Sequence, residues 1–395
     1  MVRRSILAMF TVLAIVLGGV VVSTPAGAVV DTAVIVPSPN VGTNGNELYS
    51  VSCVSVSFCV ATGFYNNGSA HQTLVEHWDG VSWTVVTSPN VGTSFNDLYS
   101  VSCVSVSFCV ATGSYSNGSA YQTLVEHWDG VSWTVVSSPN VGTNTNGLRS
   151  VSCVSVSFCV ATGSYSNGNE NQTLVEHWDG VSWTVVSSPN VGTNTNELRS
   201  VSCVSVSFCV ATGLYTIGGS TAQTLVEHWN GASWAVVSSP NVGTSFNILE
   251  SVSCVSVSFC VATGVHGGGS PFQTLVEHWD GVSWTVVPSP NVGVIANLLL
   301  SVSCVSVSFC VATGTYDGVL PVQTLVQHWD GVSWTVVSSP NDGTTSLLRS
   351  VSCVSATECV AVGFTNTGNA NQTLVVSLTG PELAPSDQVS PAFTG

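Results

Sequence analysis

The stretch Ser50–Gly63 reads SVSCVSVSFCVATG, and the same letters recur from Ser100, Ser150, Ser200, Ser251 and Ser301. A seventh, altered copy, SVSCVSATECVAVG, begins at Ser350. The repeat length is therefore about 50 residues, and a period of this size indicates one small unit of structure stacked on copies of itself. What every copy shares is expected to build the unit. What differs between the copies is where a specific function can lie.

Each unit is predicted to contain four β-strands. In the first unit, four valine-rich segments have the composition and alternation of strands: Leu48–Val54, Phe58–Gly63, Gln72–Trp78 and Val81–Val86. An Asp-Gly pair, the strongest short signal for a hairpin, separates the last two segments. No helical period appears, so each unit reads as one four-stranded antiparallel blade of a β-propeller.

The two ends of the chain carry complementary parts of a unit. The last unit runs through NQTLVVSLTG and lacks a Trp-Thr-Val-Val strand. The segment AVIVPSPN at Ala33–Asn40 aligns with WTVVTSPN at Trp83–Asn90 and supplies that strand. We therefore predict an all-β, seven-bladed propeller over residues 29–380, closed by the N-terminal strand, which removes exposed sheet edges.

Fourteen cysteines occur as one C-x5-C pair in each unit. The short turn between the first two strands places the two cysteines opposite each other, where they can bridge. Zinc-type sites usually combine closer spacings with a second ligand pair, so no metal site is expected. We predict seven local disulfides: Cys53–Cys59, Cys103–Cys109, Cys153–Cys159, Cys203–Cys209, Cys254–Cys260, Cys304–Cys310 and Cys353–Cys359. This cysteine usage is typical of an oxidising compartment.

The repeats resemble those of kelch propellers. SVSCVSVSFCVATG resembles the first hairpin of a kelch unit, and QTLVEHWDGVSWTVV resembles its third and fourth strands with their aromatic pair. The chain departs from kelch in having the single Gly63 where a double glycine is usual. The resemblance implies a propeller with a binding role. Some propellers of this type are copper oxidases, but no unique Tyr, Cys and His set stands out here, so no cofactor is expected.

The ends and the overall charge indicate a secreted protein. Residues 1–28 combine Arg3 and Arg4, an apolar run and an Ala-Gly-Ala site, which is the pattern of a cleaved signal peptide. The alternative is that this segment is retained as a membrane anchor. Residues 381–395 read as a flexible tail. Beyond residue 28 there are three arginines and no lysine against 21 acidic residues, which excludes strong nucleic-acid binding. We expect no stable membrane insertion once the signal is cleaved.

The repeated polar motifs are expected to be structural. Glu76, His77, Trp78 and their counterparts occur far from the propeller axis, so equivalent residues of different blades cannot share one substrate. We expect the tryptophans to pack between blades and the histidine to make a repeated hydrogen bond. Catalysis normally needs a single constellation of acid, base or nucleophile, and no catalytic residue is predicted.

The copies differ mainly in two variable loops: the loop between the second and third strands, and the segment that leads into the first strand. Both leave an antiparallel blade on the same face, the variable-loop face. The position four residues before the first cysteine opens the innermost strand and is predicted to form the channel mouth, with residues Tyr49, Tyr99, Arg149, Arg199, Glu250, Leu300 and Arg349. Tyr and Arg are favoured at recognition sites. A second candidate set lies in the variable loops: Tyr65, Tyr115, Tyr165, Tyr215 and Tyr316.

The sequence therefore predicts a secreted, non-enzymatic binding module for an extracellular glycan or protein. One alternative is an enzyme acting on an extracellular polysaccharide, with Glu250 or Asp97 near the mouth as acid or base. A structural surface protein is the other alternative. The ligand, the oligomeric state and any calcium binding by the loops stay open.

Overall fold

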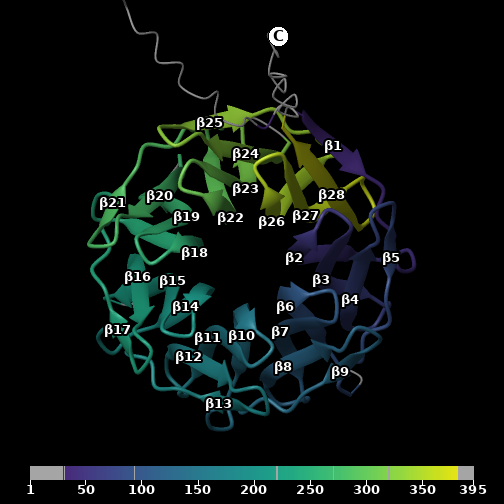
Figure 1. Cartoon of the computed structure of the whole chain (residues 1–395), viewed down its shortest axis with the longest axis horizontal. Coiled ribbons are helices and arrows are strands. Elements are labelled where there is room, and N and C mark those ends of the chain that lie inside the picture. The colour runs from purple at the N-terminus through teal and green to yellow at the C-terminus, as the bar shows by residue number, and fades with distance from the viewer. Residues whose placement is uncertain are drawn as a thin grey trace, which may run out of the picture.

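The computed structural model describes residues 30, 32–92, 94–218, 221–269, 271–318 and 321–380. The predicted signal peptide and tail lie outside them. The described residues form seven four-stranded antiparallel sheets arranged as the blades of a ring, with one strand of each sheet nearest the centre (Figure 1). They include no helix long and apolar enough to cross a membrane.

Blades 1 to 6 each contain four consecutive strands, from β2–β5 to β22–β25, and blade 7 contains β26, β27, β28 and β1. The innermost strands are β2 (Asn46–Ser55), β6 (Asn96–Ser105), β10 (Asn146–Ser155), β14 (Asn196–Ser205), β18 (Phe246–Ser256), β22 (Ala296–Ser306) and β26 (Thr345–Ser355). The second strands are β3 (Phe58–Asn66), β7 (Phe108–Ser116), β11 (Phe158–Ser166), β15 (Phe208–Ile217), β19 (Phe259–Gly267), β23 (Phe309–Asp317) and β27 (Glu358–Asn366). The third strands are β4 (His71–Trp78), β8 (Tyr121–Trp128), β12 (Asn171–Trp178), β16 (Thr221–Trp229), β20 (Gln273–Trp279), β24 (Gln323–Trp329) and β28 (Asn371–Thr379). The outermost strands are β5 (Trp83–Val85), β9 (Trp133–Val135), β13 (Trp183–Val185), β17 (Trp234–Val236), β21 (Trp284–Val286), β25 (Trp334–Val337) and β1 (Thr32–Val36).

Blade 7 joins the two ends of the described chain. β1 pairs antiparallel with β28, with Val34 opposite Ser377, so the outermost strand of this blade comes from the start of the chain. Figure 1 shows β1 at the rim beside β28.

The repeated SVSC segment links the innermost strands around the ring. The Ser50 hydroxyl accepts a hydrogen bond from the Val101 N–H of the next blade at 3.1 Å, and Ser52 accepts one from Cys103 N–H at 3.0 Å. Equivalent bonds recur around the ring, including the one from Val51 N–H to the Ser350 hydroxyl between blades 1 and 7. The serines recur because each satisfies a backbone donor that its own sheet leaves unpaired at the channel.

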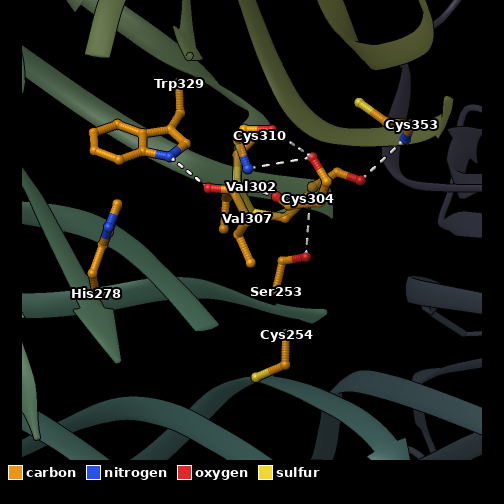
Figure 2. The surroundings of a disulfide bond; sticks show 12 residues. Ser253, Cys254, His278, Val302, Cys304, Val307, Cys310, Trp329 and Cys353 are labelled. Carbon is orange, nitrogen blue, oxygen red and sulfur yellow. Dashed lines mark hydrogen bonds between the residues drawn. A yellow bond between two sulfur atoms is a disulfide. The ribbon is translucent and has the colours of Figure 1, made fainter. Parts of the chain in front are cut away.

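All seven predicted disulfides are present. Cys53 and Cys59 are opposed in the β2–β3 register, with Cα atoms 4.0 Å apart. Figure 2 shows the Cys304–Cys310 bridge, with the Cys304 N–H bonded to the Ser253 hydroxyl of the neighbouring blade. Each bridge therefore lies where its blade contacts the next.

The tryptophans and histidines interlock the blades as predicted. Trp133 Nε1 donates to His77 Nε2 of the preceding blade at 3.3 Å, and the His77 ring lies 4.6 Å from Trp128, edge to face. The same contact joins His278 of blade 5 to Trp329 of blade 6, both labelled in Figure 2. Five interfaces use this arrangement, which buries large apolar surfaces and satisfies the indole N–H.

The fourth strands are shorter than predicted. β5 covers Trp83–Val85, whereas the sequence pattern indicated Val81–Val86. The Asp79 carboxylate accepts the N–H groups of Val81 and Ser82, both at 2.8 Å, and this turn occupies the residues expected to begin the strand. Gly80 has φ of 95° in the turn, a conformation that glycine adopts without strain.

Candidate functional site

The seven residues predicted at the channel mouth (the mouth residues) occupy one structural position. In blade 1 the pairing passes from Leu48 opposite Gly63 directly to Ser50 opposite Thr62, so Tyr49 is the extra residue of a β-bulge. The same register shift occurs at the equivalent position of the other six blades. A bulge re-aims a side chain relative to the regular alternation of the strand. The mouth is therefore built from seven bulges.

The close approach of the first two strands beside the bulge explains why Gly63 and its six counterparts are glycines. A Cβ atom at Gly63 would lie 1.9 Å from the carbonyl oxygen of Glu47, well inside contact distance. Any side chain there would push the two strands apart next to Tyr49. The repeated glycine therefore supports the mouth residues without contacting a ligand.

The mouth residues line one cavity of about 410 Å³, together with Glu197. The cavity lies among the innermost strands, which Figure 1 shows around the centre of the ring. The sequence placed these residues at the mouth from their position in the repeat alone. Glu197 was missed, because it lies two residues before Arg199 and its side chain was not expected to reach the channel.

Two of the three mouth arginines are paired with carboxylates. Arg199 Nη1 lies 2.5 Å from Glu250 Oε1, and its Nη2 lies 3.7 Å from Glu197 Oε2. Arg349 Nη2 lies 3.3 Å from Glu47 Oε2, and its guanidinium covers the Tyr49 ring at 4.7 Å. Two of the three positive charges of the mouth are therefore paired with carboxylates of the protein itself.

Arg149 differs from the other two arginines. Its guanidinium lies over the Tyr99 ring, 4.9 Å from the ring centre, and the residue is exposed. Within the described part of the chain it forms no ion pair with a carboxylate. The mouth therefore presents one guanidinium group that a ligand can approach, supported by an aromatic ring.

A polar cluster flanks the mouth between blades 1 and 2. His71 Nδ1 lies 2.9 Å from Asp97 Oδ1, and the Tyr99 hydroxyl lies 3.4 Å from Asp97 Oδ2. Burial raises the pKa of Asp97, although the nearby His71 acts in the opposite direction. Burial and the charge of Asp97 both raise the pKa of Tyr99. The His71 ring stacks on Phe64 at 3.8 Å, which fixes its orientation.

A smaller hollow of about 200 Å³ adjoins the mouth between blades 2 and 3. Tyr121, Asn171 and Glu197 line it together with Tyr99 and Arg149. Tyr121 is 39% exposed and was not among the predicted site residues. The sequence signal that could have identified Tyr121 is variation at the first residue of the third strand, which is His, Tyr and Asn in blades 1 to 3.

The second predicted set does not join the mouth. Tyr65, Tyr115, Tyr165, Tyr215 and Tyr316 lie near the ends of second strands and are half-buried against the cores between blades. Tyr316 also donates a hydrogen bond to Gln323. The structure gives these rings a packing role, and the variable-loop face has no common cavity formed by them among the described residues.

The repeated glutamates are buried hydrogen-bonding groups between blades. Glu76 is fully buried and accepts a hydrogen bond from Ser38 at 2.7 Å, while its second oxygen has no partner among the described residues. Burial raises the pKa of Glu76 to about 8, although the bond from Ser38 lowers it in part. In blade 6 Gln327 replaces the glutamate, accepting from Ser289 and donating to the Pro290 carbonyl at 2.8 Å. A protonated glutamate at this position carries an O–H group, which can donate a hydrogen bond as the amide N–H of Gln327 does.

No group of three or more His, Cys, Asp or Glu suited to a metal ion occurs among the described residues. All fourteen cysteines are in disulfides.

No family model matches the chain, and no curated protein matches its sequence. The likeness to kelch repeats therefore rests on the motifs alone. Solved propellers match the fold. A structure of YCF48 bound to a D1 peptide has 12% identity and a TM-score of 0.51, covering 90% of this chain and 99% of that one.

Two of the other similar structures are carbohydrate-active enzymes. A family 25 polysaccharide lyase (ulvan lyase) bound to a saccharide has 10% identity and a TM-score of 0.52, covering 85% of this chain and 94% of that one. The family 74 xyloglucanase of Xanthomonas campestris has 12% identity and a TM-score of 0.54, covering 85% of this chain and 55% of that one. At these identities the matches show the propeller fold, and propellers of this shape include both binders and enzymes.

Proposed function

We propose that this protein is a secreted binding module whose channel mouth recognises an extracellular glycan or protein that carries a carboxylate or sulfate group. The observation that carries the proposal is the exposed Arg149 guanidinium in a 410 Å³ cavity, stacked on Tyr99 and without a carboxylate partner among the described residues. A guanidinium binds carboxylate and sulfate oxygens through paired hydrogen bonds.

The secreted location rests on two observations. Residues 1–28 have the pattern of a signal peptide, and seven disulfides are typical of an oxidising compartment. The extracellular space is also where glycans and surface proteins are available as partners.

The composition of the mouth supports recognition over a purely structural role. A scaffold needs no cavity at the mouth, whereas Tyr49, Tyr99 and the arginines gather around one. Tyr and Arg are enriched among residues that dominate binding energies. The faces of the tyrosines also offer apolar surfaces to sugar rings.

The proposal is tested by binding of the mature protein to an array of acidic and neutral glycans, followed by titration of each ligand found. Arg149→Leu is the matched variant, because blade 6 carries Leu300 at the same position and folds around it. We expect Kd to rise at least about tenfold, since a charge-assisted hydrogen bond contributes roughly 1.5–3 kcal/mol.

Val81→Ser on the opposite face is the control and is expected to leave Kd unchanged. Arg199→Leu and Arg349→Leu are expected to have smaller direct effects, because both arginines are already paired. Unchanged binding of every ligand by the variant lacking all three arginines would exclude the mouth as the recognition site.

A second candidate function, a hydrolase or lyase acting on an extracellular polysaccharide, is favoured by the Asp97–His71 pair beside the mouth. His71 is held by Asp97 and Phe64, an arrangement that suits proton transfer by a ring nitrogen. Glu250, the other sequence candidate, is engaged by Arg199. Chain cleavage of an acidic polysaccharide that Asp97→Asn abolishes would favour the enzyme, and its absence across a polysaccharide panel would remove this candidate.

A further inference from the structure

The interface between blades 7 and 1 contains a crevice of about 270 Å³. It lies on the face that carries the β2–β3 and β4–β5 turns, whose sequences hardly change between the repeats. Its walls include Trp78, Trp83, Val360 and Val375, and its polar lining includes Glu358 and Ser377. The crevice is separate from the mouth, which lies at the other end of the innermost strands. Tyr49 and Ser55 are six residues apart on β2, which corresponds to roughly 20 Å of extended chain.

The crevice forms because two aromatic side chains are replaced in blade 7. In blade 1, Phe58 and His77 lie edge to face at 5.6 Å, and His77 contacts Trp128 and Trp133 of blade 2. The equivalent positions in blade 7 are Glu358 and Ser377. The two tryptophans of blade 1 are retained, so they face the space that the aromatic rings fill elsewhere. Small residues in place of large ones leave a cavity when the surroundings do not collapse.

Trp83 also lacks the hydrogen bond of its counterparts. Five fourth-strand tryptophans donate their indole N–H to a histidine of the preceding blade: Trp133, Trp183, Trp234, Trp284 and Trp334. Within the described residues, the Trp83 N–H has no such acceptor, because Ser377 replaces the histidine. Trp78 is half-buried, whereas Trp128 is only 7% exposed.

We propose that this crevice is a binding site for an imidazole group supplied by another molecule. One ring nitrogen accepts the Trp83 indole N–H, as His77 Nε2 accepts that of Trp133. The second ring nitrogen donates to the Glu358 carboxylate on the lining of the crevice. The flat ring packs against Trp78 in the place that histidine occupies at the five complete interfaces.

The repeat itself argues for imidazole over other aromatic groups. The same pair of tryptophans accommodates a histidine ring five times in this molecule, with ring centres 4.6–4.7 Å apart. The eight histidines of the sequence all lie at other positions: five fill the complete interfaces, and His71, His266 and His328 lie on β4, β19 and β24. In this proposal the imidazole comes from a separate source, which is either a free compound or a histidine side chain of a partner polypeptide.

The test follows the indole N–H signals of the folded protein by ¹⁵N NMR, with the Trp83 signal assigned by Trp83→Phe. In the unbound protein, Trp83 should lie apart from the five histidine-bonded signals. Titration with 4-methylimidazole should shift the Trp83 signal toward that group with Kd of roughly 1–10 mM, as suits a small fragment. Toluene, which has the ring but no nitrogen, should bind at least about tenfold more weakly.

A blocked histidine amide and a blocked phenylalanine amide distinguish the two sources. Tighter binding of the histidine amide than of 4-methylimidazole assigns the site to a histidine side chain of a polypeptide. Equal or weaker binding of the histidine amide assigns it to a free imidazole compound. Both results support the proposal, since the phenylalanine amide should produce no saturable shift of Trp83.

The matched variant is the double substitution Glu358→Phe with Ser377→His, which restores the residues of the five complete interfaces. It should abolish binding and move the Trp83 signal into the histidine-bonded group without ligand. Ser377→His alone serves the same purpose if the double variant does not fold. The proposal is overturned if 4-methylimidazole leaves the Trp83 signal unchanged, or if the restored interface binds as well as the original.

Discussion

The five interfaces among blades 1 to 6 and the two interfaces of blade 7 use the same strands but different side chains. In the five, histidine and tryptophan interlock and a buried glutamate or glutamine receives a serine hydroxyl. In blade 7, Val376 and Ser377 replace the glutamate and histidine, and Ala33 and Leu378 pair where two tryptophans pair elsewhere. The interface between blades 7 and 1 keeps one repeated contact, because Glu76 of blade 1 still accepts the Ser38 hydroxyl.

The backbone contacts do not differ between the two kinds of interface. Val351 N–H donates to the Ser301 hydroxyl at 3.1 Å, as Val101 N–H donates to Ser50. The serine bonds and the bulged innermost strands are thus common to both kinds of interface, and apolar clusters also join blade 7 to its two neighbours. The ionisable and aromatic contacts add to this arrangement, and each can be tested separately.

The largest expected effect is a loss of stability as pH rises from 6.5 to 8, caused by glutamates buried at four interfaces among blades 1 to 6 and by Glu76 between blades 7 and 1. Burial raises the pKa of these five glutamates to about 8: Glu76, Glu126, Glu176, Glu227 and Glu277. Burial also lowers the pKa of five histidines to about 4: His77, His127, His177, His228 and His278. Below pH 6.5, the glutamates and the histidines change the free energy of unfolding in opposite directions as pH changes.

A glutamate with a raised folded-state pKa contributes stability that is lost as pH rises from about 4.5 to about 8. A histidine with a lowered pKa contributes stability that is lost as pH falls from about 6.5 to about 4. We therefore expect the free energy of unfolding to change little between pH 4.5 and 6.5. It should fall by roughly 3–7 kcal/mol between pH 6.5 and 8, as measured by urea denaturation.

Glutamine at all five glutamate positions is the control, because Gln327 already occupies this site in blade 6. The glutamine protein should keep its stability above pH 6.5. An equal decline in both proteins would show that the buried glutamates are not the cause.

The next effect concerns the closure of the ring in blade 7. Removing residues 1–36 deletes β1 and exposes the edge of β28. The five paired residues of β1 contribute backbone hydrogen bonds of about 1 kcal/mol each, so the free energy of unfolding should fall by roughly 3–5 kcal/mol. A synthetic peptide of residues 30–40 added to the truncated protein should restore part of this loss in denaturation experiments. Full stability without the strand would contradict its role in closure.

The smallest effect compares one substitution at the two kinds of interface. His127→Leu leaves the Trp183 N–H without its acceptor and should cost about 1–3 kcal/mol. His328→Leu faces blade 7, where Nε2 is buried without a partner among the described residues, and should be neutral or stabilising. Thermal denaturation of the two single variants measures the difference. Equal losses would show that the tryptophan hydrogen bond contributes nothing.

The sequence predicted much of the blade because its signals are local. Opposed cysteines, the Asp-Gly turn and valine alternation each act within a few residues, and the disulfides and strand order follow from them. The fourth strand was predicted too long, since a hydrogen-bonded turn at Asp79 and a regular strand look alike in valine and serine content. The mouth residues were predicted because a closed ring brings equivalent positions together.

The sequence alone determined that this protein is a ring of seven blades, because a repeat specifies the same local pairing seven times and its ends are complementary. Only the tertiary structure decided which residues at equivalent positions of the repeat have different contacts from their counterparts. It paired Arg199 and Arg349 with carboxylates and left Arg149 exposed, and it left Trp83 facing a crevice where blade 7 lacks a histidine. The physical reason is that ion pairs and cavities depend on contacts between neighbouring blades, which lie about 50 residues apart in the chain.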